Sequence, residues 1–177
     1  MEQLVIPRDY HPNLNLHDTQ IAIKTVKDFF QSLLATRLNL CRVSAPLFVD
    51  PLSGLNDDLN GVERPVSFGI KEQNEKEAQV VHSLAKWKRY ALGKYGFSVG
   101  EGLYTDMNAI RRDEDTDNIH SIFVDQWDWE KVIRKEDRTE EYLKETVKTV
   151  YKVLRKTEKY MSIQYDYIHE ILPEDIF

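Results

Sequence analysis

The segment Ser121-Ile122-Phe123-Val124-Asp125-Gln126-Trp127-Asp128-Trp129-Glu130 decides the fold, because polar and bulky apolar residues alternate along its second half. A second β-prone run, Leu103–Arg111, precedes it across the polar turn Asp113–Asn118. Two alternating runs on either side of a polar turn predict an antiparallel pair of strands.

The second strand of the pair carries a row of polar side chains. Alternate residues of a strand point to the same face, so Gln126, Asp128 and Glu130 share one face and the two tryptophans occupy the other. Burying a polar row on a central strand is costly unless the row binds a ligand. With Arg111 nearby, this row suits a ligand that carries an ammonium group and phosphates. The alternative is a solvent-facing row on a one-sided sheet.

Length and composition favour one folded domain over residues 1–177. A chain of 177 residues with 11% aromatic residues can bury a real core. The net charge of -6 and the lack of a basic stripe argue against nucleic-acid binding. The single cysteine, Cys41, excludes an internal disulfide and is expected to be buried, in a reducing compartment. No secretion signal or membrane-spanning run is visible, so a cytoplasmic location without membrane contact is expected.

Two helices are expected before the strand pair. Asp18 can cap the first, which runs to about Leu38. Ser83 can cap the second, which runs to about Leu92 and can end at Gly93. This second helix would start immediately after a hydroxyl-bearing residue and carry a lysine close by.

A third helix is expected near the C-terminus. Asp137 and Glu140 form a capping-box pattern at its start. Its apolar side is lined by Leu143, Val147, Val150 and Leu154. The final residues, Leu172–Phe177, resemble the beginning of a further strand.

Shorter strands are expected in the first half of the chain. The run Cys41–Val49 is apolar but contains Pro46, so it should be an edge or interface strand. Val66–Ile70 and Ala78–Val81 are two more candidates. The fold class is therefore α+β, with a mainly antiparallel sheet and helices packed on it.

Arg111 is the candidate phosphate-binding residue, because its planar guanidinium donates two parallel hydrogen bonds. A carboxylate reacts readily once it is joined to AMP, and that step requires an arginine on the α-phosphate and usually Mg²⁺ on carboxylates. The alternative for Arg111 is a surface ion pair with Asp113 or Asp115. For Lys88 it is a solvated helix position, and for Asp57 a hydrophilic loop.

These pieces together resemble a known family. The pattern of Arg111–Asp115, followed by Gln126-x-Asp128-x-Glu130, resembles the second signature motif of class II aminoacyl-tRNA synthetases of the aspartyl type. The fuller strings His82–Arg89, Gly100–Thr105 and Val124–Glu130 resemble ammonia-dependent asparagine synthetase, or aspartate–ammonia ligase. The resemblance runs from about Gln20 to the end. It implies a class II synthetase-like antiparallel sheet flanked by helices and incomplete at the C-terminus.

The resemblance also implies a reaction. ATP, with Mg²⁺, would adenylate the side-chain carboxylate of L-aspartate and release diphosphate. Ammonia would then displace AMP and give L-asparagine.

The resemblance assigns roles on the amino-acid side of the site. Lys88 would pair with a substrate carboxylate, and Gln126 and Asp128 would take the substrate ammonium. Ser83 would help to frame the pocket. Asp57 would lie at the reacting end of aspartate, where the incoming ammonia must be held. Asp57 and Lys88 are implied to be catalytic.

On the nucleotide side, the resemblance implies that a catalytic Arg111 holds the α-phosphate of ATP. Ser121 and Val124 would lie at the nucleotide, and Glu130 would contact Mg²⁺. The aminoacyl-tRNA relatives usually stack an aromatic residue on adenine where this chain has Val124, so this difference favours the asparagine synthetase resemblance.

The resemblance further implies a homodimer, formed through the first helix and the strand that contains Pro46. Family members are nearly twice as long, and nothing here matches their glycine-rich third motif. The chain is therefore expected to be a fragment or one half of a split protein.

Two other functions compete with the ligase. One is a non-catalytic binding module that retains the sheet and binds an amino acid or a partner protein; the missing third motif favours it. The other is a fragment of an aspartyl-tRNA synthetase, which the tryptophan-rich strand disfavours.

Overall fold

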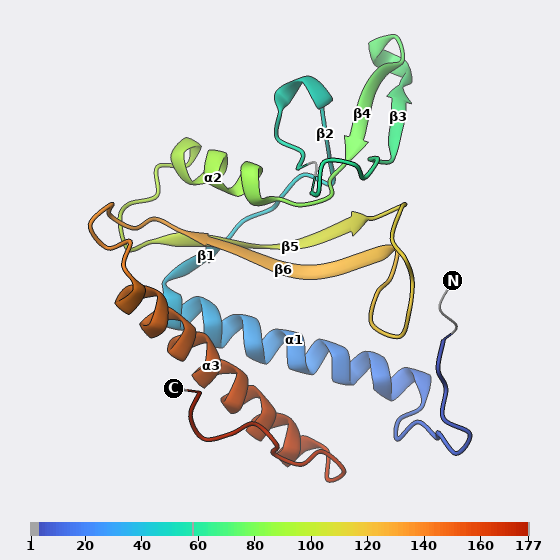
Figure 1. Cartoon of the computed structure of the whole chain (residues 1–177), viewed down its shortest axis with the longest axis vertical. Helices are drawn as coiled ribbons and strands as arrows, with labels where there is room; N and C mark the ends of the chain where they lie inside the picture. The colour runs from blue at the N-terminus through green and yellow to red at the C-terminus, as the bar shows by residue number, and fades with distance from the viewer. Residues whose placement is uncertain (1–3, 58, 177) are drawn as a thin grey trace. The chain divides into compact units, whose positions relative to one another are not determined.

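The computed structural model describes residues 4–57 and 59–176. The chain forms two compact units, whose elements are labelled in Figure 1. One unit comprises Met1–Pro7 and Cys41–Val132, and the other comprises Arg8–Leu40 and Ile133–Phe177. A single domain over residues 1–177 stays a prediction.

The larger sheet of the first unit has the strand order β1-β5-β6. Its strands are β1 (Leu40–Arg42), β5 (Gly102–Ile110) and β6 (Phe123–Lys131). β5 and β6 pair antiparallel over nine residues each, with Thr105 opposite Asp128 and Met107 opposite Gln126. The antiparallel pair predicted from the alternating runs is confirmed.

The position of β6 in this sheet differs from the expectation. Among the described residues β6 is an edge strand and β5 is the central one. The other edge of β5 is taken by the β1 segment, where the N–H of Val43 donates to the carbonyl of Tyr104 at 2.9 Å. The polar row therefore lies at the border of the sheet, where burial costs less than at its centre.

A second, smaller sheet has the order β2-β4-β3 and is antiparallel throughout. Its strands are β2 (Phe48–Val49), β3 (Ser67–Ile70) and β4 (Lys76–Val80), and 3₁₀ turns follow β2 and β3 at η1 (Pro51–Ser53) and η2 (Lys71–Gln73). The two short strands expected here are confirmed. The single strand expected over Cys41–Val49 is wrong, because the chain leaves one sheet and enters the other on either side of Pro46, which has no N–H to donate to a ladder.

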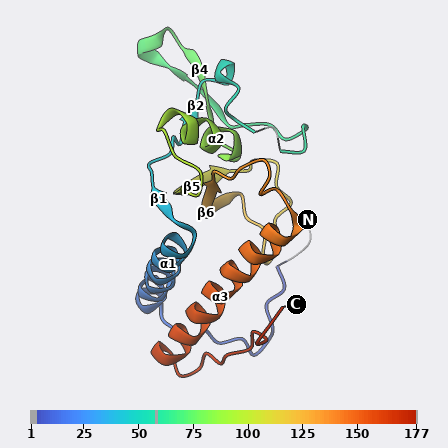
Figure 2. The ribbon, with the colours of Figure 1, turned by 90° about the vertical axis from the view of Figure 1, so that its left-hand side faces the viewer.

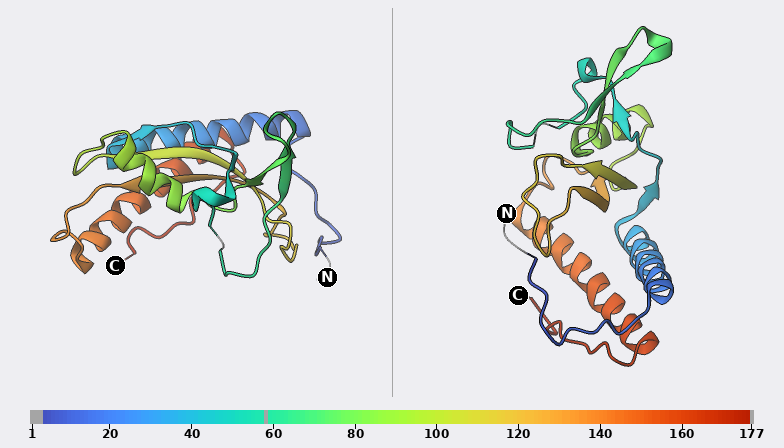
Figure 3. Two further views of the ribbon diagram at one scale, coloured as in Figure 1. Left: turned by 90° about the horizontal axis from the view of Figure 1, so that it is seen from above. Right: turned by 90° about the vertical axis from the view of Figure 1, so that its right-hand side faces the viewer.

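Helix α2 (Ala85–Lys94) packs on β5 and β6, as Figures 1 and 3 show. The core beneath it consists of buried apolar residues from α2, the two sheets and their connections: Val49, Val81, Leu84, Trp87, Ala91, Leu92, Leu103, Met107 and Ala109. α2 does not end at Gly93 as expected. Tyr95 is its C-cap, and its N–H donates to the carbonyl of Ala91 at 2.9 Å. This buried face orients the α2 side chains that point toward β6.

The second unit is built from two long helices, α1 (Leu16–Leu38) and α3 (Glu140–Gln164), which lie side by side (Figure 2). The rings of Phe29 and Tyr160 stack between them, with centroids 4.2 Å apart. The N-cap of α1 is Asn15 and not Asp18. The Asn15 side chain accepts from the N–H of Asp18 at 2.8 Å, so the expected cap residue is the one being capped.

Helix α3 differs from the expectation in two respects. Its N-cap is Thr139, whose hydroxyl accepts from the N–H of Tyr142 at 3.2 Å, and not the Asp137–Glu140 pair. Its buried residues are Val153, Thr157 and Met161, whereas Leu143 and Leu154 of the predicted apolar side are 61% and 41% exposed. The stripe facing α1 is therefore rotated from the predicted one in the C-terminal half of the helix.

The segment after α3 is tied back to that helix. The hydroxyl of Tyr151 donates to the carbonyl of Pro173 at 2.6 Å, and Glu158 accepts from the N–H of Leu172 at 3.1 Å. No strand forms over 172–176, where one was expected to begin, and Phe177 lies outside the described residues.

Cys41 is exposed and not buried as expected. No helix in the described part of the chain has an apolar run long enough to cross a membrane.

Candidate active site

All the residues predicted to form the site belong to the first unit. They come from the loop after η1, the junction between β4 and α2, α2 itself, the residue after β5, the segment before β6 and the length of β6. Three of them, Lys88, Asp128 and Glu130, form one contiguous cluster.

Lys88 is the centre of this cluster. It lies on the first turns of α2, where its N–H donates to the carbonyl of Leu84 at 2.8 Å, and its side chain is only 3% exposed. The Nζ atom donates to Oδ1 of Asp128 and to the carbonyl of Trp129 at 3.2 Å, and it lies 3.7 Å from Oε2 of Glu130. A lysine is buried at this depth only when it is paired. Here two oxygens accept hydrogen bonds from the ammonium group, and Glu130 adds a longer ion pair.

The cluster is balanced in charge. Glu130 also accepts from Nε of Arg89 at 3.3 Å, on the solvent side of α2. Two cations, Lys88 and Arg89, therefore face two carboxylates, Asp128 and Glu130. Removing any one of the four leaves an uncompensated charge in a partly dry environment.

Gln126 and Val124 lie on the same face of β6 as Asp128, as the strand register requires. Gln126 places its Nε2 atom 3.9 Å from Sδ of Met107, a weak acceptor. Val124 packs against the apolar core. An amide with a weak partner beside a carboxylate remains available for a stronger hydrogen bond.

Ser83 lies in the short connection between β4 and α2. Its hydroxyl accepts from the N–H of Ala85 at 3.1 Å, but the N-cap position belongs to Leu84, which makes no side-chain cap bond. The N-cap of α2 is therefore Leu84, one residue after the expected Ser83. The preceding residue, His82, is 1% exposed, and its ring nitrogens have no partner among the described residues. Nothing in the local sequence pattern singled out His82 as a buried polar residue.

Asp57 follows Asn56 in the loop between η1 and β3. Its Oδ1 atom is 3.7 Å from Nζ of Lys86, on the first turn of α2. Its Oδ2 atom is buried and has no hydrogen-bond partner within the described part of the chain. A buried carboxylate oxygen without a donor is rare in native proteins and marks a place where a donor can bind.

Arg111 directly follows β5, and its N–H donates to the carbonyl of Ile122 at 2.8 Å. Its side chain is 31% exposed and lies 3.8 Å from Glu114, so the ion pair that it forms is with Glu114 and not with Asp113 or Asp115, the partners named in the alternative interpretation. The Nε atom is buried and has no acceptor among the described residues. Ser121 is exposed and lies two residues before the start of β6. No hydrogen bond or ion pair joins Arg111 to the Lys88 cluster in residues 4–57 and 59–176.

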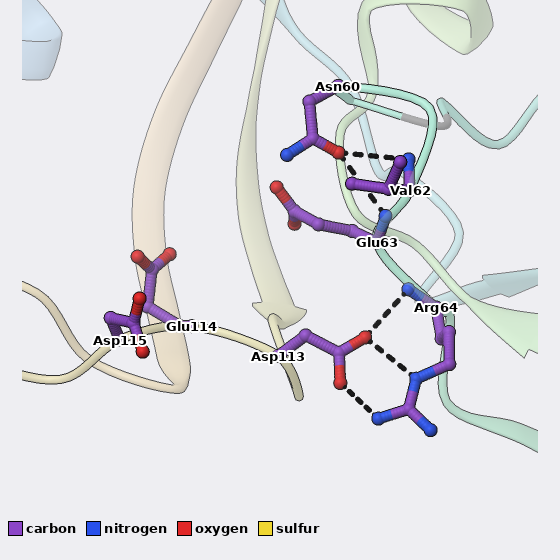
Figure 4. Close-up of a pocket in the computed structure, with 7 residues that line it drawn as sticks. All are labelled: Asn60, Val62, Glu63, Arg64, Asp113, Glu114 and Asp115. Carbon is purple, nitrogen blue, oxygen red and sulfur yellow. Dashed lines mark hydrogen bonds and ion pairs between the residues drawn. The ribbon is translucent and has the colours of Figure 1, made fainter. Parts of the chain in front are cut away.

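A second ion pair joins the loop that carries Asp57 to the turn that follows Arg111. Both carboxylate oxygens of Asp113 accept from the guanidinium of Arg64, and the N–H of Arg64 also donates to Asp113 at 2.9 Å (Figure 4). These hydrogen bonds hold the pKa of Asp113 well below its ordinary value. We call this pair the loop clamp. Sequence patterns could not reveal it, because its members are 49 residues apart.

The loop clamp borders a pocket of about 460 Å³, shown in Figure 4. It is lined by Asn60, Val62, Glu63, Arg64, Asp113, Glu114 and Asp115. None of the predicted site residues lines this pocket. It lies beside the turn that carries Arg111 and is therefore distinct from the Lys88 cluster on α2 and β6.

Magnesium is the metal that the family resemblance implies, with Glu130 as its contact. No group of three or more His, Cys, Asp or Glu residues that could hold a metal ion occurs in the described residues. A single carboxylate fits Mg²⁺ when most of the other ligands are phosphate oxygens and waters. Glu130 can contribute one oxygen to Mg²⁺ in this way only if its ion pair with Lys88 or with Arg89 breaks.

Comparison with known proteins identifies the family. Residues 17–177 match the family model described as aspartate-ammonia ligase. The chain belongs to the aspartate–ammonia ligase family.

Its curated relatives include proteins named aspartate–ammonia ligase. The one from Clostridium perfringens strain SM101 is 64% identical over 176 residues, covering 99% of this chain and 52% of the relative. The one from Clostridium tetani is 59% identical over 176 residues, with the same shares of the two chains. This chain thus spans about half the length of the curated relatives it matches. Among solved structures, a pyrrolysyl-tRNA synthetase from Desulfitobacterium hafniense aligns with a TM-score of 0.48 and 12% identity, over 78% of this chain and 50% of that one.

Proposed function

We propose that this chain forms part of an aspartate–ammonia ligase that makes L-asparagine from L-aspartate, ammonia and ATP. Membership of the family and the names of the relatives from C. perfringens and C. tetani support this proposal. The observation that carries it is the buried Lys88, held against two carboxylates of β6. Such a cluster offers complementary charges to both ends of an amino acid.

Substrate binding would exchange partners within this cluster. The ammonium group of aspartate would go to Asp128 and Gln126, and one of its carboxylates to Lys88. Lys88 and Asp128 bond to each other in the structure. An amino acid placed between them replaces one ion pair by two, so neither buried charge is left alone. Ser83, at the start of α2, would frame the pocket.

Activation would join the side-chain carboxylate of aspartate to AMP. A carboxylate oxygen attacks the α-phosphorus of ATP, and diphosphate leaves with the bridging oxygen. Negative charge builds up on the α-phosphoryl oxygens, and Arg111 would stabilise it. The buried, unpartnered Nε of Arg111 supports this assignment, since such a donor is expected to find an acceptor in a ligand. Ser121 and Val124 would lie at the nucleotide.

Amination would complete the reaction. Ammonia attacks the acyl carbon, the bond from that carbon to the AMP oxygen breaks, and the nitrogen passes one proton to the carboxylate of Asp57, which gives the neutral amide. Asp57 would hold the incoming nitrogen through its free Oδ2 atom. The other oxygen, Oδ1, lies 3.7 Å from Nζ of Lys86.

Mg²⁺ would neutralise charge on the phosphates when ATP is bound. Glu130 would contribute one oxygen to it. The ion pairs of Glu130 with Lys88 and Arg89 would then loosen, which suits a site in which Lys88 turns to the substrate carboxylate.

Two further proposals concern the whole protein. A homodimer would form through α1 and the segment around Pro46. Exposed apolar side chains on each support it: Ile21 and Ile23 on α1, and Leu47 and Phe48 after Pro46. A cytoplasmic location is also proposed; the lone Cys41 is compatible with a reducing compartment.

The test uses a chimera in which this chain replaces the matching 176-residue segment of the C. perfringens relative. With ATP, aspartate and ¹⁵N-ammonium it should form amide-labelled asparagine, AMP and diphosphate. Arg111→Ala should lose aspartate-dependent diphosphate exchange by on the order of a hundredfold or more. An inactive chimera that still binds aspartate, but not ATP, would instead indicate a binding module.

A further inference from the structure

We infer that Asn56 and Lys86 are positioning residues for Asp57, which they hold so that its Oδ2 atom faces the nitrogen nucleophile. This inference rests on the proposed function. It concerns two residues to which neither the sequence patterns nor the proposed reaction assigns a role.

Asn56 fastens its loop to the end of β4. Its Oδ1 atom accepts from the N–H of His82 at 2.9 Å, and its Nδ2 atom donates to the carbonyl of Val80 at 3.3 Å. A further contact of Nδ2, at 3.4 Å, reaches Oε1 of Gln79. Reversing the amide would set its NH₂ group against the N–H of His82, so the surroundings fix which atom is the oxygen. The side chain of Asn56 therefore holds this loop in one position against the end of β4.

Lys86 fastens the same loop to α2. Its Nζ atom donates to the carbonyl of Asn56 at 3.1 Å and lies 3.7 Å from Oδ1 of Asp57. One ammonium group thus contacts both the backbone before Asp57 and its carboxylate. Lys86 also lies two residues before Lys88 on the same helix, so this contact ties the position of Asp57 to the helix that carries the amino-acid cluster.

The result is an asymmetric carboxylate. Oδ1 of Asp57 faces a cation, whereas Oδ2 is buried without a donor among the described residues. A carboxylate free to rotate would exchange these two environments. Lys86 contacts Oδ1 directly, and the side-chain bonds of Asn56 hold the backbone that precedes Asp57. Together they keep Oδ2 as the atom that receives an N–H of the nucleophile. Displacing a reacting group by about 1 Å can cost on the order of a hundredfold in rate.

The experiment measures both half-reactions in the chimera described above, together with hydrogen exchange of the loop. In Lys86→Met and Asn56→Ala, the KM for ammonium should rise by about tenfold or more, while aspartate-dependent diphosphate exchange stays at the wild-type value. Lys86→Arg, which keeps a charged donor, should recover most of the loss. Lys94→Met, on the exposed last turn of α2, is the matched control and should behave as wild type.

Hydrogen exchange provides a readout that does not need activity. Amides of 55–57 should exchange faster in Lys86→Met and Asn56→Ala, with no change in β5 or β6. Unchanged loop exchange would overturn the positioning role, whether or not the chimera is active. An inactive chimera would by itself contradict the proposed function. The positioning role would also be overturned if loop exchange became faster in an active chimera but the KM for ammonium and diphosphate exchange were both unaltered. The same holds if both were impaired equally.

Discussion

The Nζ atom of Lys88 and the Oδ1 atom of Asp128 form a buried ion pair between α2 and β6. The two residues are 40 positions apart in the chain, yet each provides the main counter-charge of the other. This ion pair fixes the helix against the edge strand.

Removing the lysine of this pair should destabilise the protein markedly. Lys88→Met leaves Asp128 without its cation, and loss of one partner of a buried pair costs about 3 kcal/mol in the free energy of unfolding. Asp128→Leu in the same background should recover part of this loss, because the two residues are coupled by on the order of 1–3 kcal/mol. Chemical denaturation of the single and double variants measures both values. Purely additive losses would show that the pair does not act as a unit.

The loop clamp should order its loop without adding much to global stability. Arg64 is 67% exposed, so the ion pair is strongly screened by solvent. Asp113→Ala removes bonds to both the guanidinium and the N–H of Arg64, and Arg64→Ala removes only the former. Hydrogen exchange over 59–66 should therefore rise more in Asp113→Ala than in Arg64→Ala. Equal effects would exclude a contribution from the backbone bond.

The turn before Ser121 contains a histidine that should titrate above its ordinary value. The hydrogen bond from His120 to Asp117 raises the pKa of the imidazole above 6.5. The folded state thus binds this proton more tightly than the unfolded state does. The stabilisation is complete below about pH 6.5 and disappears as the pH rises through the raised pKa.

An NMR titration of the His120 ring measures this shift directly. Asp117→Asn should return the pKa of the ring toward 6.5, because it removes the largest cause of the shift. Glu114 also raises this pKa and Arg111 lowers it, so Glu114→Gln should lower it by less than Asp117→Asn does. A pKa that is identical in wild type and Asp117→Asn would refute the pairing.

The cap of α3 can be tested by exchanging one hydroxyl. Thr139→Ala removes the acceptor for the N–H of Tyr142 and should cost about 1 kcal/mol. Thr139→Ser keeps the hydroxyl and should cost much less. Thermal unfolding monitored by circular dichroism compares the two variants. Equal losses in both would mean that the methyl group of Thr139, and not its cap bond, stabilises the helix.

Local chemistry was sufficient to predict some of this structure. The β5–β6 pair follows from residue alternation and a polar turn, and its register places Gln126, Asp128 and Glu130 on one face, as predicted. Helix caps were less accurate. Asn15 and Asp18 are both good N-cap residues for α1, and Asp137 and Thr139 are both good N-cap residues for α3. Within each pair, only the backbone geometry decides which residue is the N-cap.

Long-range contacts could not be predicted in this way. No pattern of spacing relates Lys88 to Asp128, Arg64 to Asp113, or Asn56 to His82, because each contact depends on how separate elements pack. The split of the Cys41–Val49 run shows the same limit: Pro46 indicated an interruption of pairing, but not that the two parts would enter different sheets.

The central claim is that the side-chain carboxylate of aspartate becomes joined to AMP. The most direct measurement supplies the chimera with ATP, ammonium and aspartate carrying ¹⁸O in that carboxylate, and then analyses AMP and asparagine by mass spectrometry. The account predicts one ¹⁸O atom in each AMP, because the carboxylate oxygen that attacks phosphorus leaves with AMP when ammonia attacks carbon. Asparagine formed together with unlabelled AMP, or with ADP and labelled phosphate, would contradict it.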